Sequence, residues 1–146
     1  MGQAREVMDR LTEALTTTPD IKAVGELFAA DAVAVTPDEG EIHGRDNIVE
    51  YWKHMTEAVP EATFEAVYSC EVGDTAIDEG YFSGKNTGPL VLPSGESLPA
   101  TQKEIRIRGV DFATIDADGR IASYRLYFDQ MDFLGQLGLL PDELSA

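Results

Sequence analysis

The sequence contains few of the side chains that form disulfide bonds or metal sites. Its 146 residues include one cysteine, Cys70, and two histidines, His43 and His54. A single cysteine forms no internal disulfide bond, and thiolate metal sites need several cysteines. Two isolated histidines do not make a metal-binding cluster. We therefore expect no disulfide bond, no metal site, and a reducing, cytoplasmic compartment.

Basic residues are also scarce. The chain has 11 lysine and arginine residues against 27 aspartate and glutamate residues, so its net charge is −16 and its isoelectric point is near 4.2. A charge of this sign repels phosphate backbones and anionic lipid surfaces. Nucleic acid and membrane surfaces are therefore not expected as partners.

Long hydrophobic runs and phosphate-binding loops are missing as well. No apolar run approaches the roughly 18 residues that a membrane span needs. Arg5, Glu6, Asp9 and Arg10 lie near the N-terminus, where a signal peptide would place an apolar stretch. Because no glycine-rich phosphate loop is present either, we expect no cofactor and only acid/base chemistry at side chains.

What the sequence does contain is the composition of a folded domain, with 43% hydrophobic and 26% charged residues. Its length suits one domain over residues 1–146. In the first third the apolar residues recur at helical spacing, which predicts helices over 7–15 and 21–28. A third helix is expected between Gly44 and Pro60.

From Ala62 onward the apolar residues alternate, which indicates strands. The alternation places Phe64, Ala66, Tyr68, Cys70 and Val72 on one face. The other expected elements are a short strand at 33–36, a strand at 75–85, an irregular loop at 86–101, a hairpin at 103–129 and a helix from Asp129. Helices followed by a mostly antiparallel sheet predict an α+β fold, with the helices packed on one sheet face around a pocket.

The register of the hairpin follows from its turn. If Asp118 and Gly119 form a two-residue loop, Ile115 lies opposite Ala122, Ala113 opposite Tyr124, and Asp111 opposite Leu126. One face is then apolar and includes Tyr124, Leu126 and Phe128, with Asp111 as its one ionisable side chain. The outer face carries Arg106, Arg108, Val110, Phe112, Arg125 and Tyr127.

Asp111 is accordingly the main candidate for chemistry. A carboxyl group in apolar surroundings stays protonated more easily, and can then act as an acid or donate a hydrogen bond to a developing oxyanion. The alternative is a solvated aspartate, or a carboxylate satisfied by a neighbouring side chain. Tyr124, Leu126 and Phe128 would form the wall of a substrate pocket around it.

Four other residues have both a functional and a structural interpretation. His43 could act as a base in the pocket. Tyr51 and Trp52 could contact substrate or belong to the core, and Asn86 could donate to a ligand carbonyl or hold a turn. Asp129 is also ambiguous, because it could cap the last helix or pair with Arg108.

The segment from Tyr127 to Gly138, with the sequence YFDQMDFLGQLG, resembles the C-terminal signature of the SnoaL-like proteins in the nuclear transport factor 2-like superfamily. Residues 40–48 with Tyr51 and Trp52, and the segments 86–90, 99–103 and 108–111, resemble the same pattern. The resemblance implies a cone-shaped α+β fold, in which a curved, mostly antiparallel sheet and three helices enclose a hydrophobic pocket. It also implies a homodimer, for which the outer sheet face is the expected interface.

The resemblance implies function less directly, because this superfamily includes cyclases, isomerases, hydrolases and binding proteins. In the polyketide aldol cyclases, the positions of Asp111 and Leu126 carry a histidine and an aspartate. In the ketosteroid isomerases, Asp111 resembles the aspartate of the oxyanion hole, whereas Thr36 stands where the general base would be. We therefore predict cofactor-free cyclisation or isomerisation of a hydrophobic, polyketide-like carbonyl compound, with Asp111 as acid or oxyanion donor. The alternatives are a non-catalytic carrier of a hydrophobic ligand, or an interaction module that uses the outer sheet face.

Overall fold

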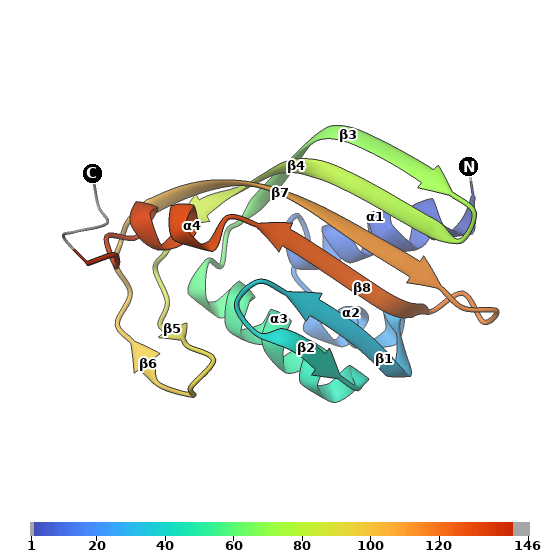
Figure 1. The fold of residues 1–146 in the computed structure, drawn as a ribbon, viewed down its shortest axis with the longest axis horizontal. Coiled ribbons are helices and arrows are strands. Elements are labelled where there is room, and N and C mark those ends of the chain that lie inside the picture. Colours follow the sequence, from blue (N-terminus) through green and yellow to red (C-terminus); the bar gives the residue numbers. More distant parts are fainter. Residues whose placement is uncertain (1, 142–146) are drawn as a thin grey trace.

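A computed structural model describes residues 2–141 and contains four helices among them. The helices are α1 (Gln3–Leu15), α2 (Ile21–Leu27), α3 (Arg45–Ala58) and α4 (Gln130–Gln136). The side chain of Asp20 caps α2, and helix α3 begins after Gly44, whose φ of 89° suits glycine. In Figure 1, α1, α2 and α3 lie on one side of the sheet, whereas α4 lies at the end of the last strand. No helix in the described range is long and apolar enough to cross a membrane.

The main sheet has six strands in the order β2-β1-β8-β7-β4-β3. Its strands are β1 (Phe28–Thr36), β2 (Gly40–His43), β3 (Thr63–Val72), β4 (Thr75–Lys85), β7 (Glu104–Ile115) and β8 (Ile121–Phe128). Strands β1 and β8 pair in parallel, and every other pair is antiparallel. The predicted α+β fold is therefore confirmed.

The hairpin of β7 and β8 has the predicted register at its centre but a different turn. Asp111 pairs with Leu126, and Ala113 pairs with Tyr124, as predicted. The turn is longer than expected, because the amide of Asp116 donates to the carbonyl of Arg120. Beyond Thr114 the register shifts by one residue, so that Ile115 pairs with Ile121 and not with Ala122. The longer turn and this shift cancel, which keeps Asp111 on the inner face.

Strand β3 does not keep on one face all the residues that its alternation places there. A bulge between Ala66 and Tyr68 inserts Val67 without a partner on β4. One extra residue reverses the faces of all residues that follow it. Tyr68 and Val72 are therefore 61% and 68% exposed, and the prediction that they share one face with Phe64 and Ala66 is wrong.

Two further boundaries differ from the prediction. Phe28 begins β1 and does not end the second helix, and β1 is longer than the expected strand at 33–36. The expected irregular loop at 86–101 contains a small two-stranded sheet of β5 (Leu90–Val91) and β6 (Ser97–Leu98). Both differences leave the pocket face of the main sheet in place.

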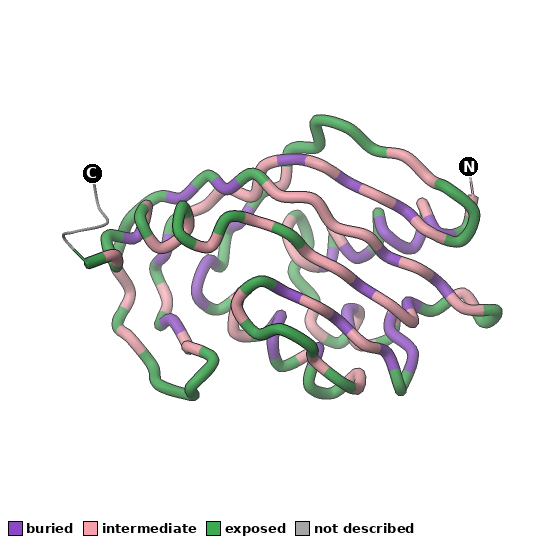
Figure 2. Tube along the Cα trace, viewed as in Figure 1, coloured by how far each residue is buried: buried purple, intermediate pink, exposed green. Residues whose placement is uncertain are grey.

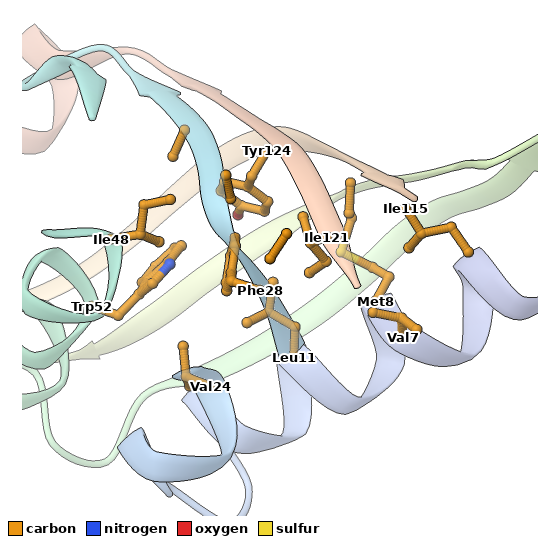
Figure 3. Close-up of a cluster of buried hydrophobic side chains, with 14 of the residues drawn as sticks. Val7, Met8, Leu11, Val24, Phe28, Ile48, Trp52, Ile115, Ile121 and Tyr124 are labelled. Atoms are coloured by element: carbon orange, nitrogen blue, oxygen red, sulfur yellow. The ribbon is translucent and has the colours of Figure 1, made fainter. Parts of the chain in front are cut away.

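The main core lies between the inner face of the sheet and helices α1, α2 and α3. Buried positions alternate with less buried ones along β4 and β7 (Figure 2). Figure 3 shows Trp52 from α3 and Tyr124 from β8 in this core, together with Phe28. The ring of Tyr124 lies edge-on to Phe28 at 6.1 Å and to Trp52 at 5.6 Å. The core thus fixes two aromatic side chains at the edge of the cavity described next.

Candidate functional site

A cavity of about 110 Å³ lies between the inner face of the sheet and helices α1, α3 and α4. Its wall is mostly apolar and includes Leu15, Met55, Phe64, Phe82, Phe128 and Phe133. Asp78 of β4 and Asp111 of β7 also line it. A cavity that is apolar with a few converging polar groups is typical of a small-molecule site.

Asp111 occupies this cavity as the hairpin register predicts. The hydroxyl of Tyr124 donates a hydrogen bond of 2.6 Å to its Oδ2 atom. The whole residue is half-buried, but its other carboxyl oxygen, Oδ1, is shielded from solvent and has no hydrogen-bond partner within residues 2–141. One carboxyl oxygen is therefore held by the protein, whereas the other is left without a hydrogen-bond partner in a residue that lines the cavity.

The environment of Asp111 raises its pKa from 3.8 to about 7. Burial is the main cause, because it penalises the charged carboxylate. The nearby charge of Asp78 raises the pKa further, whereas the hydrogen bond from Tyr124 and the charge of Arg5 lower it. At neutral pH, both the neutral acid and the carboxylate are therefore populated.

A second carboxyl group, that of Asp78, lies directly across from Asp111 in the sheet. The two residues are register partners on β4 and β7, so their side chains share the inner face. Arg5 of α1 donates a 2.7 Å hydrogen bond to Oδ2 of Asp78, and the two side chains are only 12% and 6% exposed. This ion pair leaves Oδ1 as the one carboxyl oxygen of Asp78 without a hydrogen-bond partner among residues 2–141.

The side chains around the cavity leave three polar atoms without partners. These atoms are Trp52 Nε1, Asp78 Oδ1 and Asp111 Oδ1. Each is buried and forms no hydrogen bond with another described residue. Buried polar atoms without partners are costly and are few in native proteins. All three residues line the same cavity, so one small molecule could satisfy a donor and two carboxyl oxygens together.

Of the residues predicted from the sequence, Asp111, Trp52, Tyr124, Leu126 and Phe128 line this cavity. Tyr51 does not line it. Its hydroxyl donates to Asp38 over 3.1 Å, and the residue borders a separate hollow beside Leu90. His43 lies on β2 with an exposed side chain that contacts Glu41. The structure does not bring His43 near Asp111 as a base in the pocket.

Asn86 holds the loop that follows β4. Its side-chain amide donates to the carbonyls of Ala58 and Gly88 over 2.9 and 3.0 Å. Its carbonyl oxygen accepts from the amide and the hydroxyl of Thr101 over 2.7 and 2.9 Å. These bonds leave the fully buried side chain no capacity to reach a ligand, so its structural interpretation fits the geometry.

Asp129 caps the last helix. Its side chain accepts a hydrogen bond from the amide of Asp132 over 3.1 Å at the start of α4. This is the geometry of an N-cap aspartate. The helix cap therefore accounts for Asp129, without the alternative pairing with Arg108.

The sequence analysis missed Asp78 and Arg5. Asp78 could have been found, because Ala76, Asp78, Gly80 and Phe82 alternate along the strand at 75–85 and place a single carboxylate among small and apolar residues. Arg5 gives no such signal. It reaches Asp78 only because α1 packs across β4 in the folded chain.

The described residues include no group of three or more histidine, cysteine, aspartate or glutamate side chains placed to hold a metal ion. The polar side chains that line the cavity are those of Asp78, Asp111, Tyr124, Trp52, Thr12, Thr16 and Thr56. Arg5 does not line it and contacts Asp78. Together these side chains can bind a polar group of a mostly apolar molecule and can give or take a proton.

Comparisons with known proteins agree with this architecture. A candidate SnoaL-like polyketide cyclase from Jannaschia sp. CCS1 has 17% sequence identity and a TM-score of 0.80, over 95% of this chain and 94% of that chain. IdmH, a candidate polyketide cyclase from Streptomyces antibioticus, has 23% identity and a TM-score of 0.72, over 94% and 99% of the two chains.

A third solved structure comes from Catenulispora acidiphila DSM 44928. It has a ketosteroid isomerase-like fold and contains trimethylamine, with 20% identity and a TM-score of 0.73 over 92% of this chain and 94% of that chain. No curated protein matches the sequence. The SnoaL-like domain family matches residues 8–124. This match covers most of the chain, and we conclude that the protein belongs to the SnoaL-like domain family, with a ketosteroid isomerase-like fold.

Proposed function

We propose that the protein is a cofactor-independent enzyme that cyclises or isomerises a hydrophobic carbonyl compound, with Asp111 as the acid that binds the carbonyl oxygen. The single observation that supports this proposal is the carboxyl of Asp111 in the cavity, with one oxygen held by Tyr124 and the other without a partner. The similarity to candidate polyketide cyclases agrees with a substrate of this class.

The hydrogen bond from Tyr124 determines which oxygen of Asp111 carries the acidic proton. Because Oδ2 accepts the hydroxyl proton of Tyr124, the proton of the neutral carboxyl resides on Oδ1, the oxygen without a protein partner. A neutral Oδ1–H can donate to a carbonyl oxygen and strengthen that bond as negative charge develops there. A pKa of about 7 lies close to neutral pH, where transfer of the proton is most effective.

The mostly apolar wall of the cavity supports a hydrophobic substrate. Phe64, Phe82 and Phe128 extend it along β3, β4 and β8. In such surroundings, hydrogen bonds to a developing charge are worth more than in water. The substrate would therefore be held by apolar contact and oriented by the few polar groups.

The competing function is a carrier that binds a hydrophobic ligand and releases it unchanged. The position of His43 favours it, because this residue was the expected base and its exposed side chain lies outside the cavity. The two functions differ only in whether bound molecules are converted.

The single tryptophan of the chain provides a direct binding assay, because Trp52 lines the cavity. A panel of hydrophobic β,γ-unsaturated ketones and 1,5-diketones would be titrated against Trp52 fluorescence. The same compounds would then be incubated with the protein and analysed by mass spectrometry and NMR. We expect binding and conversion, and conversion about 100-fold slower in Asp111→Asn, which cannot transfer a proton. His43→Gln is the control and should convert at the wild-type rate. Binding without conversion would support the carrier, and equal rates in wild type and Asp111→Asn would contradict the role of Asp111.

A further inference from the structure

The strongest unexplained feature of the cavity is the second carboxyl group, that of Asp78. It is 4% exposed and is the register partner of Asp111, so the two inward-facing carboxyls lie on adjacent strands. The two carboxyls have different partners. Oδ2 of Asp78 binds the guanidinium of Arg5, whereas Oδ2 of Asp111 binds the neutral hydroxyl of Tyr124.

The two carboxyls differ in the charge of their hydrogen-bond partner. Asp78 forms an ion pair with the Arg5 cation, whereas Asp111 accepts from a neutral hydroxyl and burial raises its pKa. Two neighbouring carboxyls whose environments differ can serve as base and acid in one reaction. Each also keeps one oxygen, Oδ1, without a protein partner.

Arg5 is itself held in place, so Asp78 is not paired with a mobile side chain. The guanidinium donates to Asp9 over 2.9 and 3.1 Å, and to the carbonyls of Cys70 and Ile77 over 3.4 Å. The side chain of Arg5 is 12% exposed. Its contacts on α1, β3 and β4 keep the guanidinium beside Oδ2 of Asp78.

Asp78 also has polar neighbours that Asp111 lacks. Besides the main cavity, it borders a second hollow between α1 and β3, where Thr17 and Ser69 contribute polar side chains. Asp111 does not line this hollow.

We propose that Asp78 is the general base of the site, that Asp111 is its acid partner, and that Arg5 is the positioning residue that holds the Asp78 carboxyl. This inference rests on the proposed function and names the base that this function requires. The expected substrate is a ketone that carries a hydrogen atom on the carbon next to the carbonyl.

The chemical step is an enolisation. Oδ1 of Asp78 takes the α-proton, and the electron pair of the broken C–H bond forms the C=C bond of the enol. The carbonyl π pair moves to oxygen, which receives a hydrogen bond or the proton from Oδ1 of Asp111. Where the enol is conjugated with a second C=C bond, return of the proton from Asp78 to the far carbon of that bond gives an isomer. Where the molecule has a second carbonyl, attack of the enol carbon on it closes a ring, and the new alkoxide oxygen takes the proton from Asp78. In both cases the first carbonyl re-forms and its proton or hydrogen bond returns to Asp111.

Exchange of the α-protons of 2-tetralone for deuterium in D₂O measures this step directly by NMR. We expect Asp78→Asn to lower the exchange rate at least 100-fold, while the affinity measured by Trp52 fluorescence changes less than threefold. Glu79→Gln is the matched control, because Glu79 is the next acidic residue on β4 and faces the opposite side of the sheet. It should leave both quantities unchanged.

A variant that keeps the Asp78 carboxyl tests the mechanism if Asp78→Asn does not fold. Arg5→Lys keeps the positive charge but not the fork of donors. We expect it to lower the exchange rate at saturating 2-tetralone about tenfold, because a lysine no longer fixes the position of the Asp78 carboxyl. The affinity measured by Trp52 fluorescence should change less than threefold. An unchanged exchange rate would overturn the inference.

The outcomes separate this inference from the proposed function. If wild-type protein binds 2-tetralone without deuterium exchange, the proposed function fails for this substrate class, and the role of Asp78 fails with it. If exchange occurs, is lost in Asp111→Asn and persists within threefold in Asp78→Asn, the proposed function holds and Asp78 is not the base. Loss of exchange in both variants, with binding retained, supports the pair.

Discussion

The buried carboxyl of Asp111 should make the protein less stable at neutral pH than a variant that lacks this charge. The pKa of Asp111 is about 7 in the folded protein against 3.8 for an ordinary aspartate. Between these two pH values the unfolded chain has lost the proton, whereas the folded chain retains it. Stability associated with Asp111 is therefore fully present below pH 3.8 and is lost as the pH rises through about 7.

The size of this loss follows from the difference between the two pKa values. At 1.36 kcal/mol per pKa unit, it amounts to about 4 kcal/mol of unfolding free energy once the pH is well above 7. Asp111→Asn removes the ionisation but keeps an oxygen that can accept the hydrogen bond from Tyr124. The variant should therefore gain stability over wild type as the pH rises.

Urea unfolding of both proteins, followed by circular dichroism at intervals from pH 4 to pH 8.5, tests this reasoning. The other carboxyl groups titrate in both proteins, so the difference between the two free energies isolates Asp111. We expect this difference to grow by about 4 kcal/mol in favour of Asp111→Asn over the series. A difference that stays constant with pH would show that Asp111 titrates as an ordinary aspartate and would remove the basis for its role as an acid.

Three further predictions concern single side chains. Tyr124→Phe removes a hydrogen bond that lowers the pKa of Asp111, so the pKa should rise above 7 in a carboxyl-carbon NMR titration, and a fall would contradict the assigned contact. Asn86→Ala leaves several buried loop groups without partners and should cost about 3 kcal/mol of unfolding free energy, measured by urea unfolding. We also expect a homodimer to form through the exposed outer sheet face. Arg108→Glu should then shift the mass measured by light scattering from that of a dimer to that of a monomer, and an unchanged mass would exclude this face as the interface.

The hairpin shows why the main site residue could be found from the sequence. Turn residues fix an approximate register, and the alternation of side chains then assigns each position to a face. Asp111 was placed correctly although the turn is longer than expected, because a compensating shift after Thr114 restores the pairing. The sheet face on which a residue lies can therefore be predicted well from the sequence when the strand pair is long and regular.

The parts that were not predicted depend on local irregularity or on contacts between distant segments. A single inserted residue, Val67, reverses the exposure of the rest of β3, and nothing in the alternation of the sequence indicates it. The pairing of Arg5 with Asp78 joins residues 73 positions apart. The exposure of His43 depends on the place of β2 at the edge of the sheet.

The position of Arg5 in the first turn of α1 joins the start of this helix to the sheet. The N-cap of the helix, Gly2, has no side chain, and Glu71 of β3 caps the turn by accepting the amide proton of Arg5 over 2.9 Å. The guanidinium of Arg5 also donates to Asp78 of β4, and its charge lowers the pKa of Asp111. Backbone amides in this turn should therefore be better protected from hydrogen exchange than those of an uncapped helix end. One residue at the end of a helix thus makes a fixed positive charge a lasting part of the cavity wall's surroundings.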